Sequence, residues 1–290
     1  MRNGMTDTPS KTASLAEDLT GASKFGSDEF FYDIFGINIK GLKSAWTLIR
    51  RPAEYFDAAR LPDWGGEHWP SIRIWLGLTG ILIALQFLWA SESSEMTAMF
   101  QNLATTIGDG FSVSAARDGI ELDMSVLDKE VLGKEAFKRW ILIYPFIFIA
   151  MMCVLAFIFR AWKPAANFVI RLRYIFGIIV PGTVFGLFMT LALVNATGQL
   201  YLMISMIMMP VTMVIYAVTA YRGPFHRYEM GERIGMSIVV AMLITFFLIV
   251  AHTIAMIIAA IPTWIEVIQT LMIQHDAARE AKDATNLVSP

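Results

Sequence analysis

The residues of this chain that could do chemistry are few, and the polar ones of interest lie in long segments without charge. Of the four histidines, only His252 falls in such a segment, beside Thr253, and Gln86 is a strongly polar side chain within another. A polar group in apolar surroundings serves either a proton or substrate pathway or a hydrogen bond to a neighbouring helix. His252, Gln86 and Thr253 are therefore the candidate polar site, and both interpretations stay open.

Catalytic and metal-binding patterns are missing from the rest of the sequence. There is no nucleophile elbow, phosphate loop, zinc-binding helix motif or CxxC pair, and Cys153 is the single cysteine. The four histidines do not converge by spacing, and no acid, base and nucleophile occur together. We therefore expect no catalytic residue, no metal site and no cofactor, and we predict that the protein is not an enzyme.

Two further patterns lie in the apolar segments. Proline interrupts three of them, at Pro145, Pro181 and Pro210, which predicts either packing kinks or a binding site near a kink. Small residues recur every four positions, which allows close helix approach inside one bundle or against a partner. These candidate packing or oligomer-interface residues are Gly80, Ala84, Gly182, Gly186, Ala251, Ala255 and Ala259.

The composition shows which elements hold these residues. Of 290 residues, 56% are hydrophobic and only 17% are charged, and the net charge is −2. Charge is absent from residues 74–91, 140–159, 174–221 and 234–265. Runs of about 18 or more apolar residues are typical of membrane spans, whereas soluble proteins carry about 25% charged residues. A soluble enzyme, a nucleic-acid-binding protein and a disulfide-stabilised scaffold are thereby excluded.

The runs predict an all-α integral membrane protein with a bundle of five transmembrane helices in residues 71–262. The 48 residues of 174–221 suit two spans, whereas 234–265 suits one long helix that ends near Pro262. The predicted spans are 72–90, 140–162, 174–194, 200–221 and 234–261. An external loop, 91–139, and an external C-terminal helix and tail, 263–290, complete this part of the chain.

The external loop should form a small cap on the bundle. We expect a helix from Glu92 to Ile107, and alternation on both sides of Ala116–Gly119 favours a short hairpin. Ser125 is the predicted cap of a helix that continues into the second span. The apolar beginning of the C-terminal segment should pack on this cap.

Arginine and lysine indicate the orientation. Eleven lie in 50–73, 160–173 and 222–233, against seven in 91–139, 195–199 and 263–290, with Lys138 and Arg139 as the main exceptions. Short cytoplasmic loops are enriched in positive charge, so we predict a cytoplasmic N-terminus and an external C-terminus.

The N-terminal part divides into a disordered segment, 1–25, and a cytoplasmic aromatic and amphipathic segment, 26–70. Apolar residues recur at helical spacing and form one stripe, and basic residues lie mostly off this stripe. This pattern predicts a helix on the membrane surface or one packed on the protein itself. Pro52 either breaks this helix or begins a second one. The residues concerned are Ile39, Leu42, Trp46, Ile49, Phe56, Lys40, Lys43, Arg50 and Arg51.

Two short motifs accompany this layout. Asp33-Ile34-Phe35-Gly36 is similar to the acidic–aliphatic–aromatic–glycine motif of the Yip-type five-span membrane family, with Ile37 where that family prefers proline. Residues 48–56 and 69–73 resemble the membrane entry of its bacterial relatives, although the large external loop is a departure. The resemblance implies a bacterial inner-membrane protein with a periplasmic C-terminus. It also implies a non-enzymatic role in membrane organisation, trafficking or assembly.

Two functions remain from these observations. The first is a non-enzymatic scaffold, assembly or trafficking factor, or accessory subunit, with membrane lipids and a protein partner or second copy as its partners and no nucleic acid. The alternative is a channel or transporter for a small or lipid-like solute, which requires a polar cavity near His252, Pro181 and Pro210. An intramembrane enzyme has the least support.

Overall fold

The computed structural model describes residues 39–89, 95–193, 196 and 198–288, and every regular element in this part of the chain is helical. Our expectations for residues 1–38, including the 33–36 motif, and for the loop residues 194, 195 and 197 lie outside the described residues. The α-helices are α3 (Ile39–Arg50), α4 (Pro52–Ala58), α5 (Ser71–Trp89), α6 (Glu95–Arg117), α7 (Lys129–Ile158), α8 (Phe168–Leu193), α9 (Gly198–Arg222) and α10 (Met230–Val288). Three short 3-10 helices join them: η1 (Trp64–Gly66), η2 (Met124–Val126) and η3 (Phe159–Ala161).

Four of the described helices, α7, α8, α9 and α10, are long and apolar enough to cross a membrane, which indicates a helical membrane protein. The fifth expected span corresponds to α5, whose fully described apolar part, Ser71–Phe87, is shorter. The 19 residues of α5 would reach about 28 Å, slightly less than the roughly 30 Å of a bilayer core.

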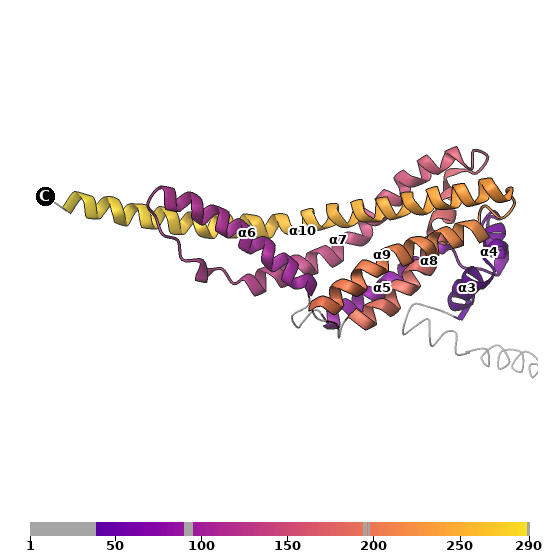
Figure 1. Ribbon diagram of the computed structural model, residues 1–290, viewed down its shortest axis with the longest axis horizontal. Helices are drawn as coiled ribbons and strands as arrows, with labels where there is room; N and C mark the ends of the chain where they lie inside the picture. The colour runs from indigo at the N-terminus through magenta and orange to yellow at the C-terminus, as the bar shows by residue number, and fades with distance from the viewer. Residues whose placement is uncertain (1–38, 90–94, 194–195, 197, 289–290) are drawn as a thin grey trace, which may run out of the picture.

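The helices form two groups that meet at one end and separate toward the other (Figure 1). α8 lies between α5 and α9 and contacts both, and α7 packs along α10. Contacts of α10 with α9 and of α7 with α8 connect the groups. A core of aromatic and aliphatic side chains fills the end where they meet, and it includes Trp75, Phe148, Phe176, Tyr216 and Phe247.

The external loop folds differently from our prediction. The expected hairpin is wrong, because α6 continues to Arg117 and the residues after it form no strand. Phe100 and Ala104 are buried, and Phe111 packs beside them against α7 and α10. Burial of this helical face outweighs the local alternation. The cap of α7 is Asp128, not Ser125: its carboxylate accepts a hydrogen bond from the Val131 amide at 3.0 Å.

α10 does not end at Pro262 but continues to Val288, and the whole helix of 59 residues is about 90 Å long, which far exceeds a bilayer. Val267 and Leu271 on its distal part are fully buried against α6 and α7. The outer stalk is the name we give to α6, the beginning of α7 and the distal part of α10, which are residues 95–117, 129–139 and 263–281. The stalk extends away from α3 and α4, and the chain ends beyond it (Figure 1). Residues 263–281 therefore pack on the segment 95–139, as expected, but as part of one unbroken helix.

At the opposite end, α3 and α4 cover the bundle. Pro52 begins α4 in the first turn, where its missing N–H costs nothing. α3 buries Ser44 and Leu48 while Leu42 and Trp46 are 56% exposed, so it packs on the protein with one face and presents the other outward. Phe56, which the sequence placed on the same apolar stripe, is 1% exposed, so this part of the stripe packs on the protein itself.

The Phe56 ring fills a slot between two glycines. An added Cβ at Gly177 of α8 would lie 2.8 Å from this ring. At Gly223, just after α9, it would overlap the ring and lie 2.7 Å from the Thr219 carbonyl oxygen. Arg173 adds to this attachment, because its guanidinium donates hydrogen bonds to the carbonyls of residues 59, 61 and 62. We call α3, α4 and the segment to residue 70 the inner cap.

Candidate functional site

A cavity of about 560 Å³ lies between the two groups of helices, and α5, α7, α8, α9 and α10 all contribute to its wall. Pockets for small ligands typically have volumes of about 300–1,000 Å³, so this one is large enough for a ligand. Trp75, Phe148 and Tyr216, from three different helices, lie at the end nearest the main core. Gln86 and Leu193 lie near the distal ends of α5 and α8.

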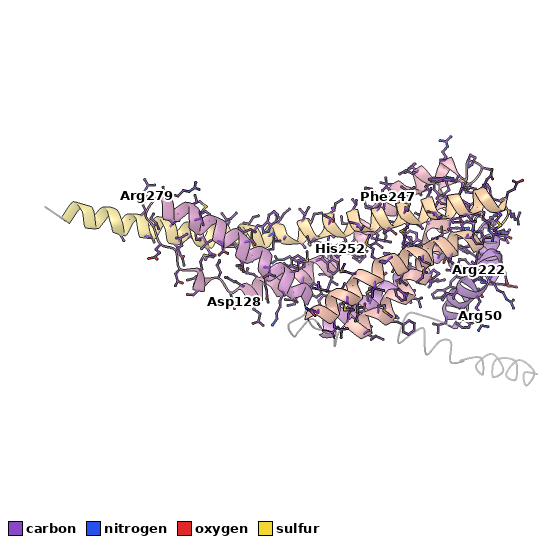
Figure 2. The ribbon with its side chains drawn as sticks, in the orientation of Figure 1. Arg50, Asp128, Arg222, Phe247, His252 and Arg279 are labelled. Carbon is purple, nitrogen blue, oxygen red and sulfur yellow. The ribbon has the colours of Figure 1, made fainter. Side chains whose placement is uncertain are left out.

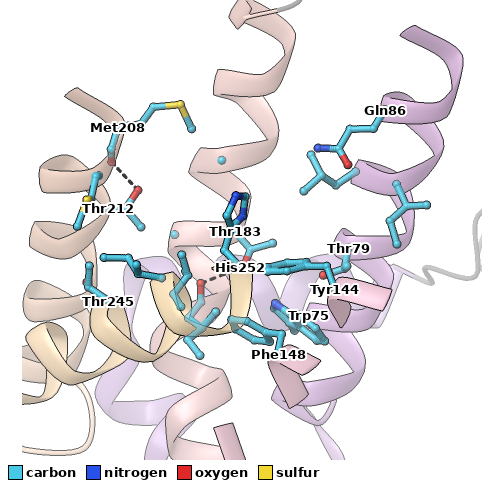
Figure 3. Close-up of a pocket in the computed structure, with 18 of the residues that line it drawn as sticks. Trp75, Thr79, Gln86, Tyr144, Phe148, Thr183, Met208, Thr212, Thr245 and His252 are labelled. Atoms are coloured by element: carbon cyan, nitrogen blue, oxygen red, sulfur yellow. Dashed lines mark hydrogen bonds between the residues drawn. The ribbon is translucent and has the colours of Figure 1, made fainter. Parts of the chain in front are cut away.

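The cavity wall is mainly apolar with a few neutral polar groups, and none of the residues that line it is Asp, Glu, Lys or Arg. Figure 3 shows Gln86, Thr183 and His252 around the open space, with Tyr144 and Thr79 beside it. Such a wall suits an uncharged, largely apolar molecule that has a polar end.

Hydrogen bonding within the wall is incomplete. Thr183 and Thr212 donate to the carbonyls of Ile179 and Met208 one turn earlier, so these hydroxyls are satisfied by their own helices. The Thr245 hydroxyl and the Trp140 indole N–H are buried and have no hydrogen-bond partner within the described part of the chain. Unpaired buried polar atoms are costly, so these two groups are available to hydrogen-bond the polar end of a ligand.

The structure brings two of the three predicted polar residues together. His252 and Gln86 both line the cavity, from α10 and α5. The His252 ring is held edge-on against Trp140, with centroids 5.0 Å apart, and against Tyr144 at 6.1 Å. Thr253 is exposed and donates to the Ile249 carbonyl, so it faces away from the cavity.

The small-residue positions separate into two kinds. Ala251, Ala255 and Ala259 are fully buried in the packing of α10, and Gly182 contacts Tyr216 of α9 so closely that a Cβ would overlap the ring. Gly80 and Ala84 are exposed, and a Cβ at Gly80 or Gly186 would meet nothing within 4 Å. Gly186, like Gly182, lines the cavity.

This difference makes Gly182 and Gly186 a matched pair. We expect Gly182→Ala to lower stability by about 1–3 kcal/mol, because the buried Tyr216 ring must move. Gly186→Ala should be neutral or slightly stabilising, because the space is open and alanine favours helix. Thermal unfolding of both variants in one detergent measures the difference, and equal melting temperatures would contradict the close α8–α9 contact.

The prolines do not line the cavity, yet each adjoins a residue that does. Pro145 follows Tyr144, Pro181 precedes Gly182 and Pro210 follows Met209. Each helix continues through its proline. Proline has no N–H, so the carbonyl four residues earlier loses its helical hydrogen bond. Each of these three carbonyls therefore lies on a helix of the cavity wall, one turn before its proline.

Several lining residues were not singled out from the sequence, among them Tyr144, Tyr216, Thr183, Thr212 and Thr245. The sequence marks these residues only by a hydroxyl group in an otherwise apolar segment. This indication is weak, because a threonine hydroxyl in a helix can donate its hydrogen bond to the carbonyl one turn earlier. Within the described residues there is no group of three or more His, Cys, Asp or Glu side chains that could hold a metal ion.

Comparison with known proteins returned nothing: no family matches this chain, nor does any curated protein or solved structure show significant similarity to it.

Proposed function

We propose that this protein binds an uncharged, lipid-like molecule in the cavity between its two helix groups and acts as a carrier or transporter for it. The observation that carries the proposal is a cavity of about 560 Å³ bordered by five helices, with no charged lining residue and with His252 and Gln86 on its wall. This develops the transport alternative, with a cavity beside His252 that is mainly apolar rather than polar and that Pro181 and Pro210 adjoin but do not line. The absence of lining charge favours a neutral solute over an ion.

The proposal includes an arrangement in the membrane. α5 acts as a fifth span beside the four longer helices, and the arginine-rich end with the inner cap faces the cytoplasm. Arg50 and Arg222 lie at this end, whereas Arg279 lies on the distal stalk (Figure 2). The C-terminus is then periplasmic, in a bacterial inner membrane, and the protein is a non-enzymatic member of the Yip-type family. The exposed Leu42 and Trp46 of α3 contact the membrane surface.

The test is ligand binding by the purified full chain. Solvent extraction after mild detergent purification should release a defined neutral lipid-like molecule, identified by mass spectrometry. A pyrene-labelled fatty alcohol should bind saturably, one per chain, and the released molecule should compete with it. A chain that carries nothing defined and binds the probe without saturation would refute the proposal.

His252 provides a sharper form of this test. We expect His252→Ala to weaken probe binding about two- to ten-fold, the value of one hydrogen bond, because the imidazole is on the cavity wall. Thr253→Ala is the control, because Thr253 is next to His252 in the chain but its side chain is exposed and faces outward. Equal affinity in both variants would remove His252 from the site.

One observation favours a second function. The outer stalk exposes Ile265, Met272 and Ile273 on the distal part of α10, with 50%, 50% and 71% of their surface accessible. Exposed apolar side chains on a helix outside the membrane are typical of a surface that binds a protein. A scaffold, assembly or accessory-subunit role, with a protein partner or a second copy, would use this surface. Native mass analysis of the extracted complex would reveal such a partner.

A further inference from the structure

A compact group of charged side chains lies at the inner-cap end of the bundle, away from the cavity. Asp57 of α4 is its centre. The Asp57 carboxylate lies 3.8 Å from Nε of Arg60 and 3.1 Å from a terminal nitrogen of Arg227. His226 Nε2 is 3.5 Å away. A single carboxylate thus holds two guanidinium groups that come from different segments of the chain.

Lys163 joins this group from the segment between η3 and α8. Its ammonium lies 4.4 Å from the ring centroid of Tyr228 and 5.4 Å from that of Phe225, the two aromatic residues that flank His226 and Arg227. The Tyr228 hydroxyl donates to the Trp162 carbonyl at 3.1 Å, which fixes Lys163 beside the α9–α10 connection. No carboxylate of the described residues forms an ion pair with Lys163.

Burial and the neighbouring positive charges both act on the ammonium of Lys163. Burial, with smaller contributions from the positive charges of Arg60 and Arg227, lowers the pKa of Lys163 to about 8, and the negative charge of Asp57 offsets only part of this effect. A nearby anion would reverse this effect, because it would favour the charged ammonium.

Three other arginines at the inner-cap end also have no carboxylate partner in the ion pairs of the described residues, so the net charge of this end stays positive. Arg173, Arg222 and Arg233 donate to backbone carbonyls, which satisfies their hydrogen bonds but leaves their charge in place. The side chains of Arg60 and Arg227 remain 37% and 60% exposed, so an anion from outside the protein can reach both guanidinium groups.

We propose that Arg60, Lys163 and Arg227 bind a phosphate group, supplied by the headgroup of an anionic phospholipid in the leaflet around the inner cap. Two guanidinium groups and an ammonium form a set of donors that suits phosphate oxygens. The three residues adjoin the ends of the apolar helices, where headgroups lie. The site is separate from the cavity and does not depend on the function proposed above.

The test uses the full chain in an uncharged maltoside detergent. Phosphatidylglycerol, phosphatidylcholine and inorganic phosphate are titrated in separate arms, and bound lipid is counted by native mass spectrometry. Phosphatidylglycerol should bind more tightly than phosphatidylcholine. The Arg60→Gln/Arg227→Gln variant should lose about ten-fold in phosphatidylglycerol affinity. Arg117→Gln/Arg279→Gln removes the same charge from exposed positions on the outer stalk and is expected to change the affinity little.

Acylation of Lys163 at pH 8 gives an independent readout in the same samples. If the bound phosphate raises the lysine pKa by one unit, the uncharged fraction falls from about a half to about a tenth, and acylation slows about five-fold. Lys40 and Lys43 are internal controls. Equal slowing by inorganic phosphate would overturn the headgroup as the source. No slowing by either, or unchanged lipid binding in the Arg60 and Arg227 variant, would overturn the site.

Discussion

Replacing Phe56 with alanine should destabilise the protein by about 3–5 kcal/mol and release the inner cap from the bundle. The phenyl ring is 1% exposed and fills the slot between Gly177 and Gly223. Because these two residues have no side chains, the slot is wide enough for the ring, and a smaller side chain would leave it partly empty. The variant leaves a void at the point where α4 meets α8 and α9. Thermal unfolding in detergent measures the loss, and limited proteolysis within residues 51–70 reports detachment of the cap.

Phe188→Ala is the matched control for Phe56→Ala. Phe188 is also on a helix of the bundle but is 62% exposed, so its removal creates no internal void. We expect a small change in melting temperature and no new cleavage between residues 51 and 70. If the two alanine variants unfold alike, the ring of Phe56 does not anchor the cap.

The outer segment shows what could be predicted from the sequence and how the prediction went wrong. Phe100, Ala104, Ile107, Phe111 and Ala115 recur at intervals of three and four, which is the pattern of a helix with one buried face. The alternation after Phe111 suggested a strand, but it covers only a few residues. The longer periodicity was the better guide, because it matched the face that α7 and α10 bury.

The end of α10 illustrates a different limit. Proline inside a helix costs about 3 kcal/mol, so an end near Pro262 was a reasonable expectation. The helix continues because Val267 and Leu271 pack against Leu132 and Ala104 of the stalk. That compensation involves residues roughly 130 to 170 positions away in the sequence. The apolar beginning of the C-terminal segment predicted packing on the cap, but not that one helix continues through Pro262.

The cavity was within reach of the sequence only in part. Charge-free runs identify helices, and polar residues within them identify His252 and Gln86 as unusual. Whether these residues share one space depends on the rotation of α5 and α10 about their own axes, and on the separation of the two helix groups. Thr253 shows the difficulty, because it adjoins His252 in the chain but faces away.

The Gly186→Phe variant should bind the ligand much more weakly while keeping the fold intact. Gly186 lines the cavity and has nothing within 4 Å of the position of a Cβ, so a large ring can enter the space without displacing the protein. It would occupy volume that the ligand needs. We expect the affinity for the pyrene-labelled fatty alcohol to fall at least about ten-fold, equivalent to about 1.4 kcal/mol, with an unchanged melting temperature.

Gly80→Phe separates filling of the cavity from the general effect of adding a ring. Gly80 has the same open surroundings but lies on α5 outside the cavity wall, so this variant should bind the probe like the unaltered protein. Loss of binding in both variants would mean that the probe occupies the outer surface of the bundle. Normal binding by Gly186→Phe would mean that the ligand does not occupy the cavity, and transport through it would then be refuted in favour of a role for the stalk.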